Sequence, residues 1–143
     1  MAITASGLMF ISLEKMLTNA AALNLEAEDY KGALVDDNHT PNFDTDATWN
    51  NTNEVSGTGW AAGGVALTGT EITTSSGTWK LDATDVSETT TTLTSVMAYR
   101  WYADPVADEE ILVVDFVTAV NTVAGTFAIT WHADGIATHD FTP

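Results

Sequence analysis

The sequence predicts an all-β fold, an antiparallel β-sandwich of about eight strands with one short N-terminal α-helix. Within residues 52–81, glycines separate short runs that are rich in Val, Ile, Thr and Trp, as expected for strands joined by tight turns. Near the C-terminus, Phe127, Ile129 and Trp131 alternate with small or polar residues, which is the period of a half-buried strand. The only apolar stripe with a period of 3.6 residues lies before Leu23, so we expect a single helix.

The composition predicts one acidic domain. The chain has 143 residues, which we divide into an N-terminal arm and helix over residues 1–28 and a β-sandwich over residues 29–143. Four Lys and Arg against 20 Asp and Glu give a formal net charge of −16. Such a charge repels phosphates, so we expect neither nucleic-acid nor membrane binding. The same acidity suits a high-salt medium, which is an alternative to an ordinary acidic surface. There is no cysteine, so neither a disulfide nor a thiolate metal site is available.

The N-terminal region predicts an amphipathic helix over residues 7–22. Ser6 is the expected N-cap, and Asn24 is expected to help end the helix. Two roles are open for this helix: it covers one end of the sheet, or it is an arm that docks on a neighbouring subunit. The apolar stripe consists of Leu13, Met16, Leu17, Ala20 and Ala21.

The expected strands after the helix follow the alternation of apolar residues and turns. An Asp-Pro pair ends the longest strand, and an acidic turn returns the chain into a well-buried apolar run. The C-terminal segment is expected at a sheet edge. The ranges are 30–35, 90–102, 111–117, 126–131 and 136–141, in addition to short strands within 52–81.

The sequence contains no recognisable catalytic or cofactor motif, so we expect a protein that is not an enzyme and has no cofactor. Asn42, Asp44 and Asp46 have the alternate spacing of the first ligands in a calcium loop. However, Ala47 stands where that loop needs glycine, and Asn53 stands where it needs a bidentate Glu. A hydrogen-bonded turn is the default interpretation of this triplet, and no metal site is expected.

The tryptophans are divided between core and surface. Trp79, Trp101 and Trp131 occupy alternating strand positions and are expected in the core. Trp49 lies in a polar loop and Trp60 follows a glycine, so these two remain open as surface contacts, including contacts to a sugar.

Several motifs resemble one family of small virion proteins of tailed bacteriophages and archaeal tailed viruses. The segment 53–67, NEVSGTGWAAGGVAL, is similar to that family's NEVSGTG-aromatic-x-AGG motif. The resemblance continues with Trp-Lys-Leu-Asp at 79–82, the aromatic segment 99–102 and Phe-Ala-Ile-Thr-Trp at 127–131, followed by Gly135-Ile136. It covers the chain from about Tyr30 to the C-terminus.

The resemblance implies a structural protein of a virus particle. The first hypothesis is a capsid decoration subunit, of the cement or turret kind, on the outer head surface. The alternative is a component of the tail or fibre tip that binds a host receptor or glycan. The expected partners are the major capsid protein and copies of the chain itself, with a trimer as one option. The expected interface residues are Met9, Phe10, Ile11, Trp49 and Trp60.

Overall fold

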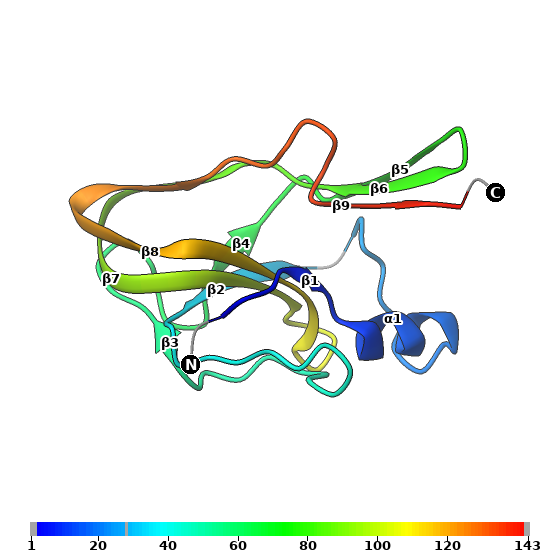
Figure 1. The fold of residues 1–143 in the computed structure, drawn as a ribbon, viewed down its shortest axis with the longest axis horizontal. Helices are drawn as coiled ribbons and strands as arrows, with labels where there is room; N and C mark the ends of the chain where they lie inside the picture. The colour runs from blue at the N-terminus through cyan, green and yellow to red at the C-terminus, as the bar shows by residue number, and fades with distance from the viewer. Residues whose placement is uncertain (1–2, 28, 142–143) are drawn as a thin grey trace.

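The computed structural model describes residues 3–27 and 29–141, which form a β-sandwich with one helix (Figure 1). The larger sheet has six strands in the order β1-β8-β7-β2-β3, with β4 also pairing with β2. The smaller sheet has three strands in the order β5-β6-β9. All pairings between these strands are antiparallel, as the sequence predicts. The elements are β1 (Gly7–Leu8), α1 (Phe10–Leu17), β2 (Tyr30–Val35), β3 (Glu54–Val55), β4 (Val65–Leu67), β5 (Glu71–Ser75), β6 (Thr78–Asp82), β7 (Val86–Ala103), β8 (Glu109–Ile129) and β9 (Ala137–Asp140).

Two long strands of the larger sheet, β7 and β8, form a hairpin ribbon that bends so that its far end lies in the same layer as the smaller sheet. They pair from Ala103 and Glu109 at the turn to Val86 and Ile129 at the other end. Figure 1 shows the ribbon leaving the lower layer, bending at one end of the molecule and returning in the upper layer. Register shifts interrupt the pairing between Glu88 and Ala98. Such irregularities bend paired strands sharply, and here they coincide with the bend.

The main core lies between the two layers. The strand β2 is almost fully buried apart from Lys31, which explains why the rest of its sequence is apolar without alternation. Its partner β7 is buried from Val96 to Ala103 for the same reason. Gly32 lies beside the Tyr99 ring, and a Cβ atom at Gly32 would come within 2.0 Å of that ring. Glycine at this position therefore makes room for the aromatic core.

A second, smaller apolar cluster lies outside the main core. Its buried members include Ile3 and Met9 from the N-terminal arm and Met97 and Val113 from the larger sheet. Phe43 and Trp49, from the long loop between β2 and β3, pack against it. The arm from Ile3 to Met9 is therefore part of the folded domain, and β1 joins the larger sheet by pairing with Leu112 and Val113.

The glycine-rich segment 53–67 contains β3, β4 and the tight turns between them, and several of its residues make defined local contacts. Glu54 Oε1 accepts a hydrogen bond of 2.5 Å from the Gly63 N–H. Tyr102 Oη donates to the Gly63 carbonyl oxygen at 2.5 Å. Gly64 has φ +83°, and a Cβ there would lie 2.2 Å from the Gly32 carbonyl oxygen. The turns of this segment place Trp60 in the core, where it is 1% exposed.

Candidate functional site

The helix α1 is apolar on two sides, one packed on the sheet and one exposed to solvent. On the inner side, Met9 at the N-cap position and Ser12 are each 1% exposed, and Met16 packs against the main core. On the outer side, Phe10 is 62%, Leu13 37% and Leu17 79% exposed. These positions are spaced i, i+3 and i+7, so they share one face of the helix. We call Phe10, Leu13 and Leu17 the outer stripe.

The ends of α1 are fixed by backbone contacts. At the N-terminus, no side chain caps the helix, and the carbonyl oxygen of Phe43 accepts from the Phe10 N–H at 2.8 Å. At the C-terminus, Asn19 has φ 57° and donates to the Met16 carbonyl, while Ala20 donates to the Lys15 carbonyl. This is the hydrogen-bond pattern of a Schellman motif, in which Asn tolerates the left-handed conformation. The helix therefore ends at Leu17.

The predicted helix was too long at both ends. Ser6 is not its N-cap, because β1 intervenes and Ser6 Oγ instead accepts a hydrogen bond of 2.8 Å from the Asp115 N–H. Asn24 does not end the helix, since Asn19 already does so. The predicted stripe was only partly right: Met16 packs against the main core, whereas Leu17 is 79% and Leu13 37% exposed.

A polar network joins α1 to the start of β8. Ser12 Oγ lies 2.7 Å from Glu109 Oε1 and 2.5 Å from the Glu110 carbonyl oxygen, so its one proton is donated to one of them at a time. Lys15 Nζ donates to Glu109 Oε2 at 2.6 Å. The Glu109 side chain is 4% exposed, so this ion pair is weakly screened by solvent. The contact fixes the rotation of α1 and hence the direction of its outer stripe.

The next residue, Glu110, forms a buried two-point ion pair with Arg100. Arg100 Nε donates to Glu110 Oε1 at 2.6 Å, and its Nη2 donates to Glu110 Oε2. Burial raises the pKa of the Glu110 carboxyl, while the hydrogen bonds and charge of Arg100 oppose this shift. Removing one partner of such a buried pair leaves an uncompensated charge, which costs about 3–5 kcal/mol of stability.

Trp49 lies over the same pair at the surface. Its ring stacks on Tyr102, with centroids 5.3 Å apart and planes at 12°, and Arg100 Cζ is 4.7 Å from its centroid. Trp49 is half-buried, so the residue keeps some exposure to solvent. The stacking holds the ring in one orientation.

The loop that carries Trp49 also contains a buried histidine. His39 is 7% exposed, and its Nε2 has no hydrogen-bond partner among the described residues. Burial lowers the pKa of His39 from 6.5 to about 4, and the nearby charge of Arg100 contributes in the same direction. The carboxylates of Asp46 and Asp36 act in the opposite direction. The imidazole is therefore neutral near pH 7.

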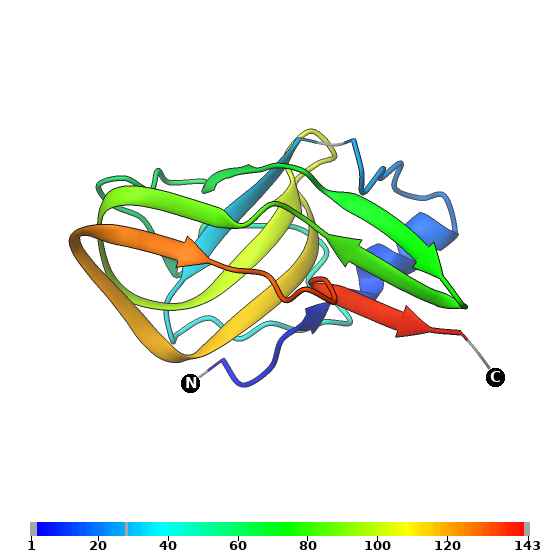
Figure 2. The same cartoon turned by 90° about the horizontal axis from the view of Figure 1, so that it is seen from above.

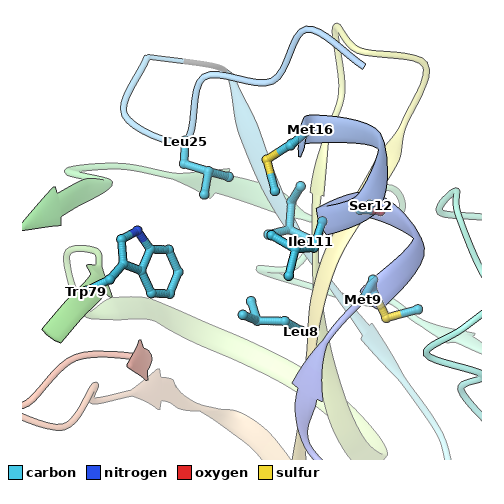
Figure 3. Close-up of a pocket in the computed structure, with 8 residues that line it drawn as sticks. Leu8, Met9, Ser12, Met16, Leu25, Trp79 and Ile111 are labelled. Carbon is cyan, nitrogen blue, oxygen red and sulfur yellow. The ribbon is translucent and has the colours of Figure 1, made fainter. Parts of the chain in front are cut away.

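A small apolar groove separates α1 from the smaller sheet (Figure 3). Its volume is about 30 Å³, and in Figure 3 the Trp79 ring lies across it from Met16, Leu25 and Ile111. A cavity of this size holds about one water-sized group, so it is too small for a cofactor. A second hollow, of about 260 Å³, lies between the β1 edge and the segment around Trp131 and Ile136.

The structure separates the predicted interface residues into two groups. Phe10 is exposed, and Ile11 and Trp49 are half-buried, so these three remain accessible. Met9 and Trp60 are each 1% exposed, so the expectation that they are surface contacts is wrong. Met9 is a buried member of the second apolar cluster, and Trp60 packs edge-to-face on Phe127. Leu13 and Leu17 were missed as surface residues because they were assigned to the packed side of the helix.

The other tryptophans occupy the core to different degrees. Trp101 is fully buried, as predicted. Trp79 and Trp131 are only partly buried and pack at the margin of the main core. Trp131 Nε1 donates to the Thr84 carbonyl at 3.1 Å, which ties the segment after β8 to the segment after β6.

The triplet Asn42, Asp44 and Asp46 forms hydrogen-bonded turns. Asn42 Oδ1 accepts from the Asp44 N–H at 3.1 Å, and Asp46 Oδ2 accepts from the Asn42 N–H at 2.8 Å. In the described ranges, no three or more His, Asp or Glu side chains are grouped as metal ligands. The helix within those ranges is too short to cross a membrane.

Comparisons of the chain with models of known protein families, with curated proteins and with solved structures found no match. The geometry of the site therefore carries the functional argument, together with the motifs noted in the sequence.

Proposed function

We propose that this protein is a non-enzymatic structural subunit of a tailed-virus particle, a decoration protein that docks on the outer surface of the capsid. The observation that carries the proposal is the outer stripe of α1, an exposed apolar surface on a helix whose orientation is fixed. The motifs in segment 53–67, which resemble those of small virion proteins, supply the virion context.

The outer stripe has the properties of a docking element. Phe10 and Leu17 are 62% and 79% exposed, and each fully buried side chain of this type stabilises an interface by about 1.5–3 kcal/mol. The anchoring of α1 through Ser12 and Lys15 means that little conformational entropy is lost on docking. An apolar stripe on a rigid element therefore favours a stable, repeated contact over a transient one.

The charge of the protein supports a location on the outside of the particle. A formal net charge of −16 opposes contact with packaged nucleic acid. The proposed partner is the major capsid protein. Because the chain is acidic, docking on it depends on apolar contacts or on a basic patch of that protein. Copies of the chain itself are the second proposed partner.

A component of the tail or fibre tip that binds a host receptor or glycan is the second candidate. The half-buried Trp49 favours it, because stacking on Tyr102 holds this aromatic side chain in one orientation at a loop. Aromatic faces of this kind are suited to packing against apolar ligand surfaces.

Copy number distinguishes the two locations. We expect hundreds of copies per particle for a decoration subunit and a handful for a tail tip, measured by quantitative gel staining of purified particles. A handful of copies would contradict the decoration role and leave the tail role.

Co-sedimentation with undecorated particles tests the docking surface itself. Leu17→Asp is expected to abolish binding while leaving the melting temperature close to that of the unsubstituted protein, because Leu17 is 79% exposed. Phe141→Asp is the matched control, since Phe141 is 72% exposed but lies after β9, outside the outer stripe. Equal binding by both variants would exclude the outer stripe as the docking surface.

A further inference from the structure

Within the part of the chain that the structure describes, the outer edge of β8 has no strand partner over most of its length. Among the described strands, β1 pairs with β8 only at Leu112 and Val113, while β7 occupies the other side. Figure 2 shows the gold and orange part of β8 running along the outside of the molecule, with no further strand beside it. An open edge presents backbone N–H and C=O groups that can pair with another strand.

This edge lacks the charged residues that normally protect an open strand. No Asp, Glu, Lys or Arg occurs from Phe116 to Ala133, in a chain with a net charge of −16. The outer strands of the smaller sheet, β5 and β9, carry Glu71 and Asp140, respectively. The strand β4 is also uncharged, but it has only three residues. From Phe116 onward, the β8 edge is therefore a segment along which two copies can approach without opposing carboxylates. Asp115, just before this segment, accepts a hydrogen bond of 2.7 Å from the Val117 N–H.

The exposed part of this edge is apolar and held in place. Val117 and Val123 are 80% and 86% exposed. Side chains fix the strand to β7: Asn121 Oδ1 accepts from the Ser95 N–H at 2.8 Å, and Thr122 Oγ1 accepts from the Leu93 N–H at 3.1 Å. An edge that is already ordered loses little entropy when it pairs.

Two kinks mark the ends of the available run. Val117 has φ 65° and Ala124 has φ 47°, whereas the residues between them are in the strand without positive φ. A β-branched residue at positive φ is rare and strained, so the bend at Val117 is a specific feature of this fold. The edge thus offers a run of defined length between two bends, and within it the pairing with β7 shifts register between Leu93 and Ala98.

The sequence of this run is nearly its own reverse. It is Val117-Thr118-Ala119-Val120-Asn121-Thr122-Val123, in which valines occupy both ends and the centre, and threonines lie symmetrically between them. In an antiparallel pair around a two-fold axis at Val120, Val117 lies opposite Val123 of the second copy, and Val120 lies opposite its own copy. β-branched and Thr–Thr pairs in these positions stabilise antiparallel strands.

We propose that this edge pairs with the same edge of a second copy of the chain, forming a two-fold dimer whose larger sheet continues from one subunit to the other. A two-fold interface requires a self-complementary surface, which the symmetric run supplies. The interaction does not depend on the virion function and can be tested with purified protein alone. Since both copies are acidic, the dimer is favoured by added salt.

Engineered cysteines test the register, because the chain has no cysteine of its own. In the proposed dimer the two copies of residue 120 are directly opposite, with Cα atoms about 4.5–5.5 Å apart, which is within disulfide range. Val120→Cys is therefore expected to form a covalent dimer rapidly under mild oxidation. Val123→Cys is the control: its side chain is more exposed, 86% against 36%, but the two copies of residue 123 lie about 20 Å apart.

Three results of this experiment decide the proposal. Rapid cross-linking of Val120→Cys alone, together with cross-linking in a mixture of Val117→Cys and Val123→Cys, would establish the two-fold register. Equal cross-linking of Val120→Cys and Val123→Cys would indicate random collision and overturn it. Failure of Val120→Cys to cross-link would overturn it as well.

Light scattering after size-exclusion chromatography tests the same interface without cysteines. The unsubstituted protein is expected at twice its 15.2 kDa chain mass, with a dimer fraction that rises with salt. Thr118→Lys is expected to give a folded monomer, whereas Thr73→Lys, an exposed threonine on the edge strand β5, should remain dimeric. A monomeric unsubstituted protein throughout a dilution series would contradict the proposal.

Discussion

Trp60 and Phe127 pack edge-to-face at the centre of the sandwich, with ring centroids 5.2 Å apart and planes at 76°. They are far apart in the sequence: Trp60 lies in the glycine-rich segment 53–67, and Phe127 lies in the last part of β8. The pair therefore joins the segment 53–67 to the long ribbon, and aromatic pairs of this geometry contribute about 0.5–1.5 kcal/mol beyond their buried area.

Phe127→Ala is expected to reduce the free energy of unfolding by about 3–5 kcal/mol, because it removes a buried ring and leaves a cavity beside Trp60. Chemical denaturation measures this change. Trp131→Ala should also destabilise, but by less, since Trp131 is only partly buried. Phe141→Ala is the matched control, because Phe141 is 72% exposed. A Phe127 variant as stable as this control would show that the ring lies at an interface and not in the core.

Two neighbouring glycines should respond differently to the same substitution. Gly63 and Gly64 have φ +82° and +83°, so alanine at either position pays the strain of a left-handed residue, about 1–2 kcal/mol. A Cβ at Gly63 has its nearest neighbour at 3.8 Å, whereas one at Gly64 would lie 2.2 Å from the Gly32 carbonyl oxygen. We expect Gly64→Ala to lower the melting temperature clearly more than Gly63→Ala. Equal effects would mean that the backbone at the β2–β4 contact shifts at little cost to make room for the added Cβ atom.

His39 should make the protein less stable in mild acid. Its pKa is lowered to about 4 in the folded chain, against 6.5 for an ordinary histidine. Between these values the unfolded chain binds more protons at this site, so lowering the pH favours unfolding. The expected loss from pH 7.5 to pH 5 is about 2 kcal/mol, measured by denaturation at each pH. His39→Gln should flatten this dependence, whereas His132→Gln, whose side chain is 76% exposed, should not.

Deleting residues 1–10 tests whether the N-terminal arm can be separated from the domain. Of the two roles that the sequence leaves open for the helix, a docking arm would leave a folded β domain that no longer attaches to the particle, and a cover of the sheet would leave an unfolded one. However, Ile3 and Met9 are 3% and 1% exposed, and β1 is paired with β8, so we expect a large loss of thermal stability. Phe10→Ala is the control, because it removes an exposed ring without the buried arm. A truncated protein with the melting temperature of the full chain would show that the arm is not needed for folding, as the docking-arm hypothesis requires.

The sequence predicted the fold class because its strongest signals are local. The strand β2 has the predicted bounds, since a short, mainly apolar run before a polar loop is typical of a buried strand. The alternation around Phe127 and Ile129 correctly placed both in the core. By contrast, the segments 111–117 and 126–131 were predicted as separate strands, although they are parts of β8. The residues between them lack a clear strand period because the ribbon bends there.

The candidate site was less predictable because it depends on contacts between distant segments. Trp60 follows a glycine, which suggested a surface position, but its burial depends on Phe127. The side of α1 that faces the sheet is decided by Ser12, a polar residue that fits inside only because Glu109 and the Glu110 carbonyl are there to accept its proton. A pattern of apolar residues gives no information about such a partner.

The ribbon of β7 and β8 gives the sandwich a mechanical property that two separate sheets would lack. Because the same two paired strands run through both layers, a shearing force on one layer is transmitted to the other along covalent backbone and an antiparallel ladder. The layers cannot slide apart unless the ribbon straightens at its bend, which requires the register shifts between Glu88 and Ala98 to be lost. We therefore expect resistance to shear to be concentrated at the bend, where the two strands turn from one layer into the other.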